Sequence, residues 1–169
     1  MDYQDWGFDD HSQSDPIETY FARFPSFTYI PGPDWRQLRA FYDLADHFGW
    51  DDKRKRRERA QLKAAWVGIV ETEFQGSTLQ HYQGLCQDLR IRNVPDTVAE
   101  CKEMLKGVFV NIVDLVQYRR DRDRGVMTRK PRKFGTLEEL RRYSEEERKY
   151  YPRDNAKSEM LRELLQVLL

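Results

Sequence analysis

The strongest pattern in this chain is a run of apolar residues between positions 98 and 115 that repeats with helical spacing. The apolar positions, spaced 3-4-3-4-3, are Val98, Cys101, Leu105, Val108, Ile112 and Leu115. Residues three and four apart share one face of an α-helix, so this spacing predicts a helix over residues 97–118. The segment VFVNIVDLV within it is apolar nearly all round, which is typical of a helix buried at the centre of a fold. Its β-branched residues also fit a strand, but the length and the unbroken spacing favour the helix.

Shorter helical patterns lie on both sides of this central helix. They cover residues 16–24, 34–48, 51–75, 78–89 and 136–151, with a last helix beginning after Asp154 or Asn155. Residues that can cap a helix start precede several of them, namely Asp34, Asp51, Thr78, Asp96 or Thr97, and Thr136 with Glu139 as a capping box. No convincing strand is found. The sequence therefore predicts an all-α fold, a compact bundle of about six or seven helices around the buried central helix.

The chain is long enough to fold as one domain. With 169 residues it can bury roughly two thirds of the surface that the unfolded chain exposes, so it needs neither a disulfide nor a metal to fold. Charged residues make up 34% of it, which favours solvated helices over a β-sandwich. We expect a tail over residues 1–15 and a single helical domain over 16–169, with a basic loop at 119–135. Cys86 and Cys101 are expected as small core residues, although a bridge between them stays open.

The sequence predicts no membrane anchor and no secretion signal. It contains no run of about 18 apolar residues, which a transmembrane helix would need. The N-terminus MDYQDWGFDD is acidic and lacks the basic and apolar regions of a signal peptide. We therefore expect an intracellular protein, cytoplasmic or nuclear, that does not bind a membrane.

Several segments resemble a known group of proteins. The segments, in order, are FARFPSFTYIPG, HFGWD, LCQDLRI, VPDTVAECK, VFVNIVDLVQYRR and AKSEMLRELLQVLL. Together they resemble a group of small, functionally uncharacterised proteins of filamentous fungi, over most of residues 18–169. The resemblance implies a helical fold and an intracellular fungal protein. It carries over no functional residue, and the first 15 residues and the basic loop are the parts in which such proteins differ most.

Basic residues are concentrated in the run KRKRRER, although the formal net charge of the chain is zero. The candidate phosphate-binding or partner-binding residues in this run are Lys53, Arg54, Lys55, Arg56 and Arg57. Consecutive helical residues are about 100° apart, so the run surrounds a helix instead of lining one face, which favours an ordinary solvated helix start. Five bases in the first two turns nevertheless oppose the helix dipole, so a nuclear address or an anion-binding patch stays as the alternative.

A second basic stretch lies in the loop YRRDRDRGVMTRKPRKFG. Its candidate binding residues are Arg129, Lys130, Arg132 and Lys133. If the loop folds back beside residues 53–59, the two stretches would form one phosphate-binding surface. No aromatic residues are interleaved with either stretch, which disfavours recognition of single strands by stacking. A solvated loop without a ligand is the alternative.

The N-terminal segment DYQDWGFDD mixes acidic residues with Tyr3, Trp6 and Phe8. Aromatic residues anchor interfaces and acids steer them toward basic partners, so this segment is a candidate docking tail. A disordered tail is one alternative. Docking of the tail on a basic patch of its own chain is another.

Signatures of catalysis are weak. His11, His47 and His81 are scattered without metal-binding spacing, and no GxGxxG, GxxxxGK[ST] or GxSxG motif occurs. Asn111 and Asp114 are the polar residues of the central helix, and we expect them to face solvent or to satisfy a neighbouring helix end. A pocket at both residues would instead favour an enzyme.

The sequence therefore predicts a non-enzymatic protein–protein interaction module, an adaptor or regulatory subunit, with no cofactor and no metal. The expected partner is another protein. The alternative is a nuclear protein whose basic patches bind the phosphates of nucleic acid, and the oligomeric state stays open.

Overall fold

The computed structural model describes residues 15–32, 37–151 and 156–166, apart from the side chains of Leu38 and Gln166. Within these residues eight helices pack compactly and the strands form only a small hairpin, so the predicted all-α class is confirmed. The elements are α1 (Pro16–Ala22), α2 (Gln37–His47), α3 (Asp52–Glu73), α4 (Leu79–Asp88), α5 (Val98–Lys106), β1 (Phe109–Val110), α6 (Ile112–Asp123), β2 (Lys133–Phe134), α7 (Leu137–Glu147) and α8 (Glu159–Gln166).

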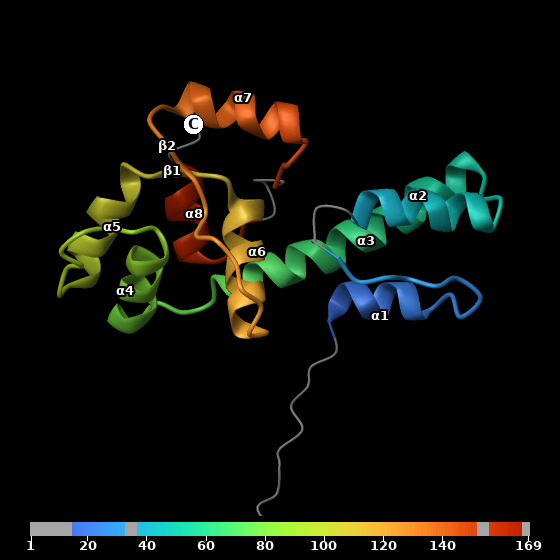
Figure 1. Ribbon diagram of the computed structural model, residues 1–169, viewed down its shortest axis with the longest axis horizontal. Helices are drawn as coiled ribbons and strands as arrows, with labels where there is room; N and C mark the ends of the chain where they lie inside the picture. The colour runs from blue at the N-terminus through green and yellow to red at the C-terminus, as the bar shows by residue number, and fades with distance from the viewer. Residues whose placement is uncertain (1–14, 33–36, 152–155, 167–169) are drawn as a thin grey trace, which may run out of the picture.

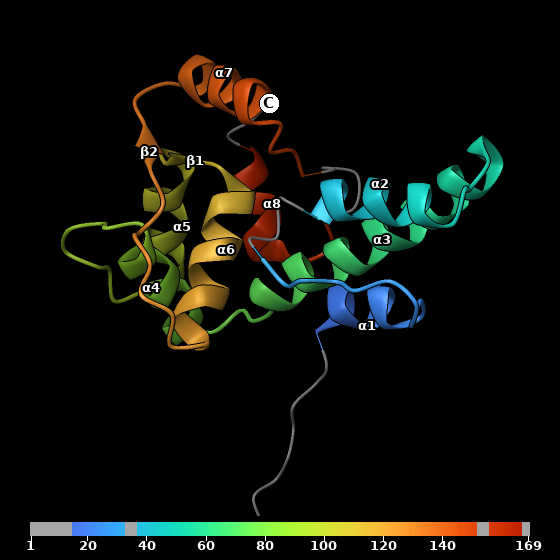
Figure 2. The same cartoon turned by 45° about the vertical axis from the view of Figure 1, so that its right-hand side comes forward.

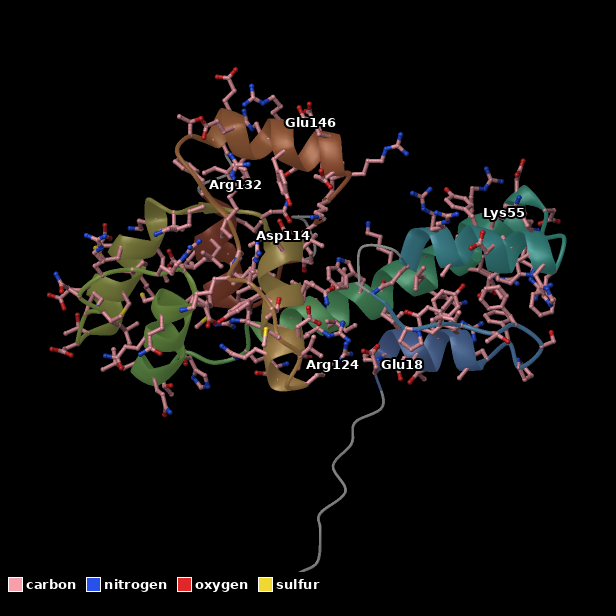
Figure 3. The ribbon with its side chains drawn as sticks, viewed as in Figure 1. Glu18, Lys55, Asp114, Arg124, Arg132 and Glu146 are labelled. Carbon is pink, nitrogen blue, oxygen red and sulfur yellow. The ribbon has the colours of Figure 1, made fainter. Side chains whose placement is uncertain are left out.

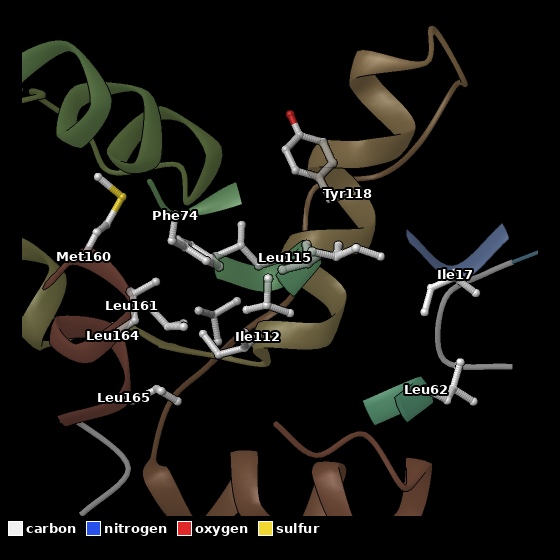
Figure 4. Packing of buried hydrophobic residues seen from close by; sticks show 14 of the residues in the cluster. Ile17, Leu62, Phe74, Ile112, Leu115, Tyr118, Met160, Leu161, Leu164 and Leu165 are labelled. Atoms are coloured by element: carbon white, nitrogen blue, oxygen red, sulfur yellow. The ribbon is translucent and has the colours of Figure 1, made fainter. Parts of the chain in front are cut away.

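The long helix α3 organises the molecule. α1 and α2 lie along its N-terminal part, at the right of Figure 1, and its C-terminal end reaches the group formed by α4, α5, α6 and α8. The turned view in Figure 2 shows the same arrangement, with α7 lying beyond the hairpin of β1 and β2. Buried apolar side chains form one continuous cluster, from Ile17 in α1 through Phe74 to Leu165 in α8. Figure 4 shows part of this cluster around Phe74 and Leu115.

The predicted single helix over residues 97–118 is wrong, because the segment divides into α5, β1 and α6. Gly107 follows the last turn of α5, and Phe109–Val110 then pairs antiparallel with Lys133–Phe134. Asn111 begins α6, its Oδ1 accepting hydrogen bonds from the backbone N–H groups of Val113 at 3.0 Å and Asp114 at 3.2 Å. The β-branched stretch thus adopts the strand conformation that its composition also fitted, and Asn111 starts a new helix.

The apolar spacing still identifies the buried face. Cys101, Leu105, Ile112 and Leu115 are all buried, although they belong to two helices. Cys86 packs in the same core, and both cysteines are free thiols. Burial, reinforced by Cys101, raises the pKa of the Cys86 thiol to about 12, so this thiol stays protonated at neutral pH.

Side-chain caps set several of the predicted helix starts. Asp51 Oδ1 accepts from Arg54 N at 2.7 Å, and Thr97, not Asp96, caps α5 by accepting from Glu100 N at 3.2 Å. Thr136 Oγ1 accepts from Glu139 N at 3.1 Å as predicted, but the Glu139 carboxylate reaches back to Gly135 N, at 2.9 Å. The other predicted caps, Asp34, Asp154 and Asn155, lie outside the described residues.

Two further expectations need correction. The basic loop was expected from residue 119, but α6 continues to Asp123, so its first five residues are helical. The apolar spacing of the helix predicted over residues 34–48 puts Tyr42 and Phe48 on its buried face, but Tyr42 in α2 is 44% exposed and Phe48, just after α2, is 38% exposed. The buried side of this helix is narrower than the sequence indicated.

Candidate interaction surfaces

The predicted basic residues at the start of α3 differ in what they contact. Three of them are engaged: Arg54 lies over the ring of Trp50 at 4.8 Å, Lys55 Nζ is 3.9 Å from Asp46 Oδ1, and Arg57 Nη2 is 3.4 Å from Glu58 Oε1. Lys53 and Arg56 are exposed and form no hydrogen bond or ion pair with the described part of the chain.

Two more bases extend this unpaired set along α3. Arg59 and Lys63 are also exposed and have no hydrogen bond or ion pair within the described residues. We use the name basic stripe for Lys53, Arg56, Arg59 and Lys63. Their spacing of 3-3-4 places them on one side of the helix, over a length of about 15 Å. The run does surround the helix, as expected, but packing buries one side of α3 and leaves a one-sided row of bases open.

The acid within the run does not neutralise the stripe. Glu58 is only 3% exposed and faces α1, where its Oε2 accepts from Arg23 Nη2 at 3.1 Å. Arg23 Nη1 also donates to Gln61 Oε1 at 2.5 Å, which fixes α1 against α3. Burial, with Glu58 adding to it, raises the pKa of the neighbouring Tyr20 to about 12. Glu58 therefore has a packing role on the opposite side of the helix from the stripe.

Of the two exposed aromatic residues near α3, only Tyr42 lies on the side of α2 that approaches the stripe. The ring of Phe48 packs instead toward α1, with its centroid 5.7 Å from that of Phe24 and 6.2 Å from that of Trp50. Tyr42 lies one helical turn before Asp46, the residue that approaches Lys55, so it lies on the side of α2 next to α3. Sequence reasoning missed Tyr42 because its neighbour Phe41, which is fully buried, suggested a common apolar face.

The second basic stretch is used partly to hold its own loop in place. Lys130 Nζ donates to the carbonyl of Gln87 at 2.8 Å and Lys133 Nζ to that of Arg90 at 3.4 Å. Arg90 Nη2 in turn donates to the carbonyl of Pro131 at 3.0 Å. The two lysine bonds satisfy backbone carbonyls at and just after the C-terminal end of α4, and the arginine bond satisfies a carbonyl of the loop itself. Arg132 lies over the Phe134 ring at 4.7 Å, and the exposed Arg129 has no such contact within the described residues.

The two basic stretches do not meet. Figure 3 shows Lys55 at the far end of α3 and Arg132 beside β2, on the other side of the molecule. Figure 2 shows the same separation between the start of α3 and β2. The single phosphate-binding surface that required the loop to fold back beside residues 53–59 is therefore not formed.

A charged cleft of about 540 Å³ lies where α3, α4 and α6 meet. Arg119 and Arg122, expected in a loop, both bond Asp88, with Arg119 Nε 2.8 Å from Oδ2 and Arg122 Nη1 2.7 Å from Oδ1. Burial raises the pKa of the nearby Glu73 carboxyl above its usual value despite the adjacent Arg119. Sequence reasoning missed this cleft because its charges come from three separate segments. Its central charges neutralise one another, which is typical of a structural network.

Asn111 and Asp114 bond to the end of α7. Asn111 Nδ2 donates to Ser144 Oγ and to the carbonyl of Lys149, both at 3.0 Å. Asp114 accepts from Tyr143 Oη at 2.7 Å and from Lys149 Nζ at 2.8 Å. A small cavity of about 170 Å³ borders Asn111, but Asp114 does not line it. Both residues thus satisfy a neighbouring helix end, as the sequence indicated.

The candidate docking tail with Tyr3, Trp6 and Phe8 lies outside the described residues. The described chain begins at Asp15, whose Oδ1 caps α1 by accepting from Ile17 N at 2.8 Å. The other carboxylate oxygen pairs with Arg120 and, at 2.7 Å, with Arg124. The segment that carries the tail is thus attached beside α6.

No long apolar helix of the membrane-spanning kind is found in the described residues, and no cluster of three or more metal-ligating side chains is found among them. In comparisons with known proteins, no protein-family model, curated protein or solved structure matches this chain. The resemblance to fungal proteins therefore stays a prediction.

Proposed function

We propose that this protein is a non-catalytic helical interaction module that binds an acidic segment of a partner protein through the basic stripe of α3. The observation that carries the proposal is the row of four exposed bases without an acid partner in the described chain. Elsewhere in the structure, bases such as Arg119 and Lys149 are paired with acids. An unpaired row of one sign attracts a partner of the opposite sign and speeds its association.

The border of the stripe supports a protein partner. Tyr42 offers exposed aromatic surface on the side of α2 next to the bases, and aromatic residues are enriched where proteins bind one another. The alternative, a nucleic-acid-binding protein, loses support because the two basic stretches lie far apart. Lys130 and Lys133 also hold the loop in place, which leaves fewer charges for phosphates.

The test is affinity capture from an extract of the source organism, with the full-length tagged protein and with or without nuclease. The stripe variant K53Q/R56Q/R59Q/K63Q removes four charges from exposed positions. The control variant R92Q/R129Q/R142Q/R162Q removes four charges from exposed bases elsewhere. Glutamine suits helices, so each single change should alter the free energy of unfolding by no more than about 0.5 kcal/mol.

We expect wild type and control to retain the same nuclease-resistant protein, and the stripe variant to lose it. Loss of all captured proteins on nuclease treatment would contradict the proposal and favour the alternative, a nucleic-acid-binding protein. Equal capture by the stripe variant would mean that the partner binds another surface.

A further inference from the structure

We infer that the acidic–aromatic segment of this same chain, residues 2–10, docks on the basic stripe and competes with the partner for it. The inference rests on the proposed function, because it names a second occupant of the same surface. Residues 1–14 lie outside the described residues. Their sequence, their attachment point at Asp15 and the charge of the stripe support the assignment.

The charges of the segment and of the stripe match. Residues 2–10 contain four aspartates and no base, and the four bases of the stripe have no ion pair within the described residues. The segment also contains Tyr3, Trp6 and Phe8, and the exposed Tyr42 lies on the side of α2 next to the stripe. Acids opposite bases give this pair electrostatic complementarity, and an exposed aromatic ring beside the bases adds apolar surface for the aromatic residues of the segment.

The bases closest to the attachment point are already paired. Asp15 engages Arg120 and Arg124, and Arg122 pairs with Asp88 at 2.7 Å. Each of these arginines has lost part of its attraction for a further acid, because a carboxylate already lies against it. Among the residues that the structure describes, no carboxylate pairs with the bases of the stripe on α3.

The segment is long enough to reach the stripe. α1 follows Asp15, lies along α3 and ends where Arg23 meets Glu58 at 3.1 Å. The seven residues of α1 rise about 10 Å, and a helix with its side chains is about 10–12 Å across. Trp6 is nine residues from Asp15, a span of up to about 30 Å when extended. This reach of about 30 Å exceeds the rise of α1 and the width of one helix added together, about 22 Å. Trp6 and the flanking aspartates can therefore pass around α3 to the side that carries the stripe.

A tethered segment is a strong competitor even when its own affinity is modest. A short linker gives an effective concentration on the order of 1 mM. Suppose that the free segment binds with a Kd of about 10 μM. The tethered copy then occupies the stripe most of the time and lowers the apparent affinity of a competing peptide by about 100-fold. The tail would then set the threshold at which an acidic partner binds.

The experiment is a fluorescence-anisotropy titration with a labelled peptide of residues 1–14, MDYQDWGFDDHSQS, as the probe. It is added to full-length wild type and to the tail variant D2N/D5N/D9N/D10N, in which the tethered segment has lost its charges. We expect the tail variant to bind the peptide about 10-fold to 100-fold more tightly than wild type. Adding K53Q/R56Q/R59Q/K63Q to the tail variant should abolish binding, whereas adding R92Q/R129Q/R142Q/R162Q should not.

Equal affinity of wild type and tail variant would overturn the inference, as would peptide binding that survives loss of the stripe. The capture experiment separates this failure from a failure of the proposed function. If the partner still requires the stripe while the tail variant changes neither capture nor peptide binding, only the tail inference is wrong. If the stripe variant retains both partner and peptide, both proposals are wrong.

Discussion

At the scale of single residues, Asp88 joins three helices through two arginines. It is 4% exposed at the end of α4, and it bonds Arg119 and Arg122 of α6. Arg119 Nη1 also donates to the backbone carbonyl of Glu73, at 2.6 Å, in the last turn of α3. From the sequence alone, the alternating charges of residues 119–124, RRDRDR, predict partial neutralisation within that stretch. The main partner of these arginines instead lies 31 and 34 residues away along the chain.

Replacing Asp88 should therefore be costly. Asp88→Asn leaves Arg119, which is 8% exposed, without its charge partner, and we expect the free energy of unfolding to fall by about 3 kcal/mol. Urea denaturation followed by circular dichroism measures this change. The same substitution at the exposed Asp123, which pairs with the exposed Arg122 at 3.1 Å, should cost less than about 0.5 kcal/mol. Similar costs for both variants would contradict a structural role for the buried network.

At the scale of elements, the break between α5 and α6 shows how local signals compete with periodicity. The 3-4 spacing continues through the break, because it reports which residues face the core and not whether the helix is continuous. Asn111 is the residue that sets the start of α6. It caps α6 and at the same time binds Ser144 and Lys149, so one side chain starts one helix and holds the end of another.

The double role of Asn111 predicts a larger effect than a cap alone. Asn111→Ala removes the cap and leaves the partly buried Lys149 carbonyl without this donor, so we expect the free energy of unfolding to fall by about 2–3 kcal/mol. Thr97→Ala removes an exposed cap whose second hydrogen bond, from Oγ1 to Glu100 Oε2 at 2.7 Å, stays within the same turn, and it should cost about 1 kcal/mol. Thermal and urea unfolding of the two variants give the comparison. An Asn111→Ala cost no greater than that of Thr97→Ala would show that the contact with α7 contributes little.

At the scale of the whole molecule, α3 connects the two ends of the structure. Leu62 is buried near α1, whereas Phe74 is buried among α6 and α8, and both belong to the same apolar cluster (Figure 4). Because one rigid helix contributes to both ends, a loss of packing at either end also weakens the packing at the other end. This arrangement favours a single cooperative unfolding transition.

We predict that one core substitution at either end of the molecule shifts the whole unfolding transition. Leu62→Ala and Leu164→Ala should each lower the free energy of unfolding by about 2–5 kcal/mol, since both side chains are buried. Tryptophan fluorescence, to which Trp50 just before α3 and Trp66 within α3 contribute, should change together with the far-ultraviolet circular dichroism in each variant. Separate transitions for the two probes would mean that the ends unfold independently.

The sequence by itself determined the helical class, most of the helix starts and most of the buried positions. These follow from local rules: apolar residues repeat at helical spacing, and short polar side chains such as Asp51 and Thr136 satisfy the first N–H groups of a helix. It also located the basic run of residues 53–59. Only the tertiary structure decided which of those bases are open, because that depends on which side of α3 is covered by α1 and α2. The pairing of Asp88 with Arg119, the strand at Phe109–Val110 and the exposure of Tyr42 likewise depend on contacts between distant segments, which local spacing does not encode.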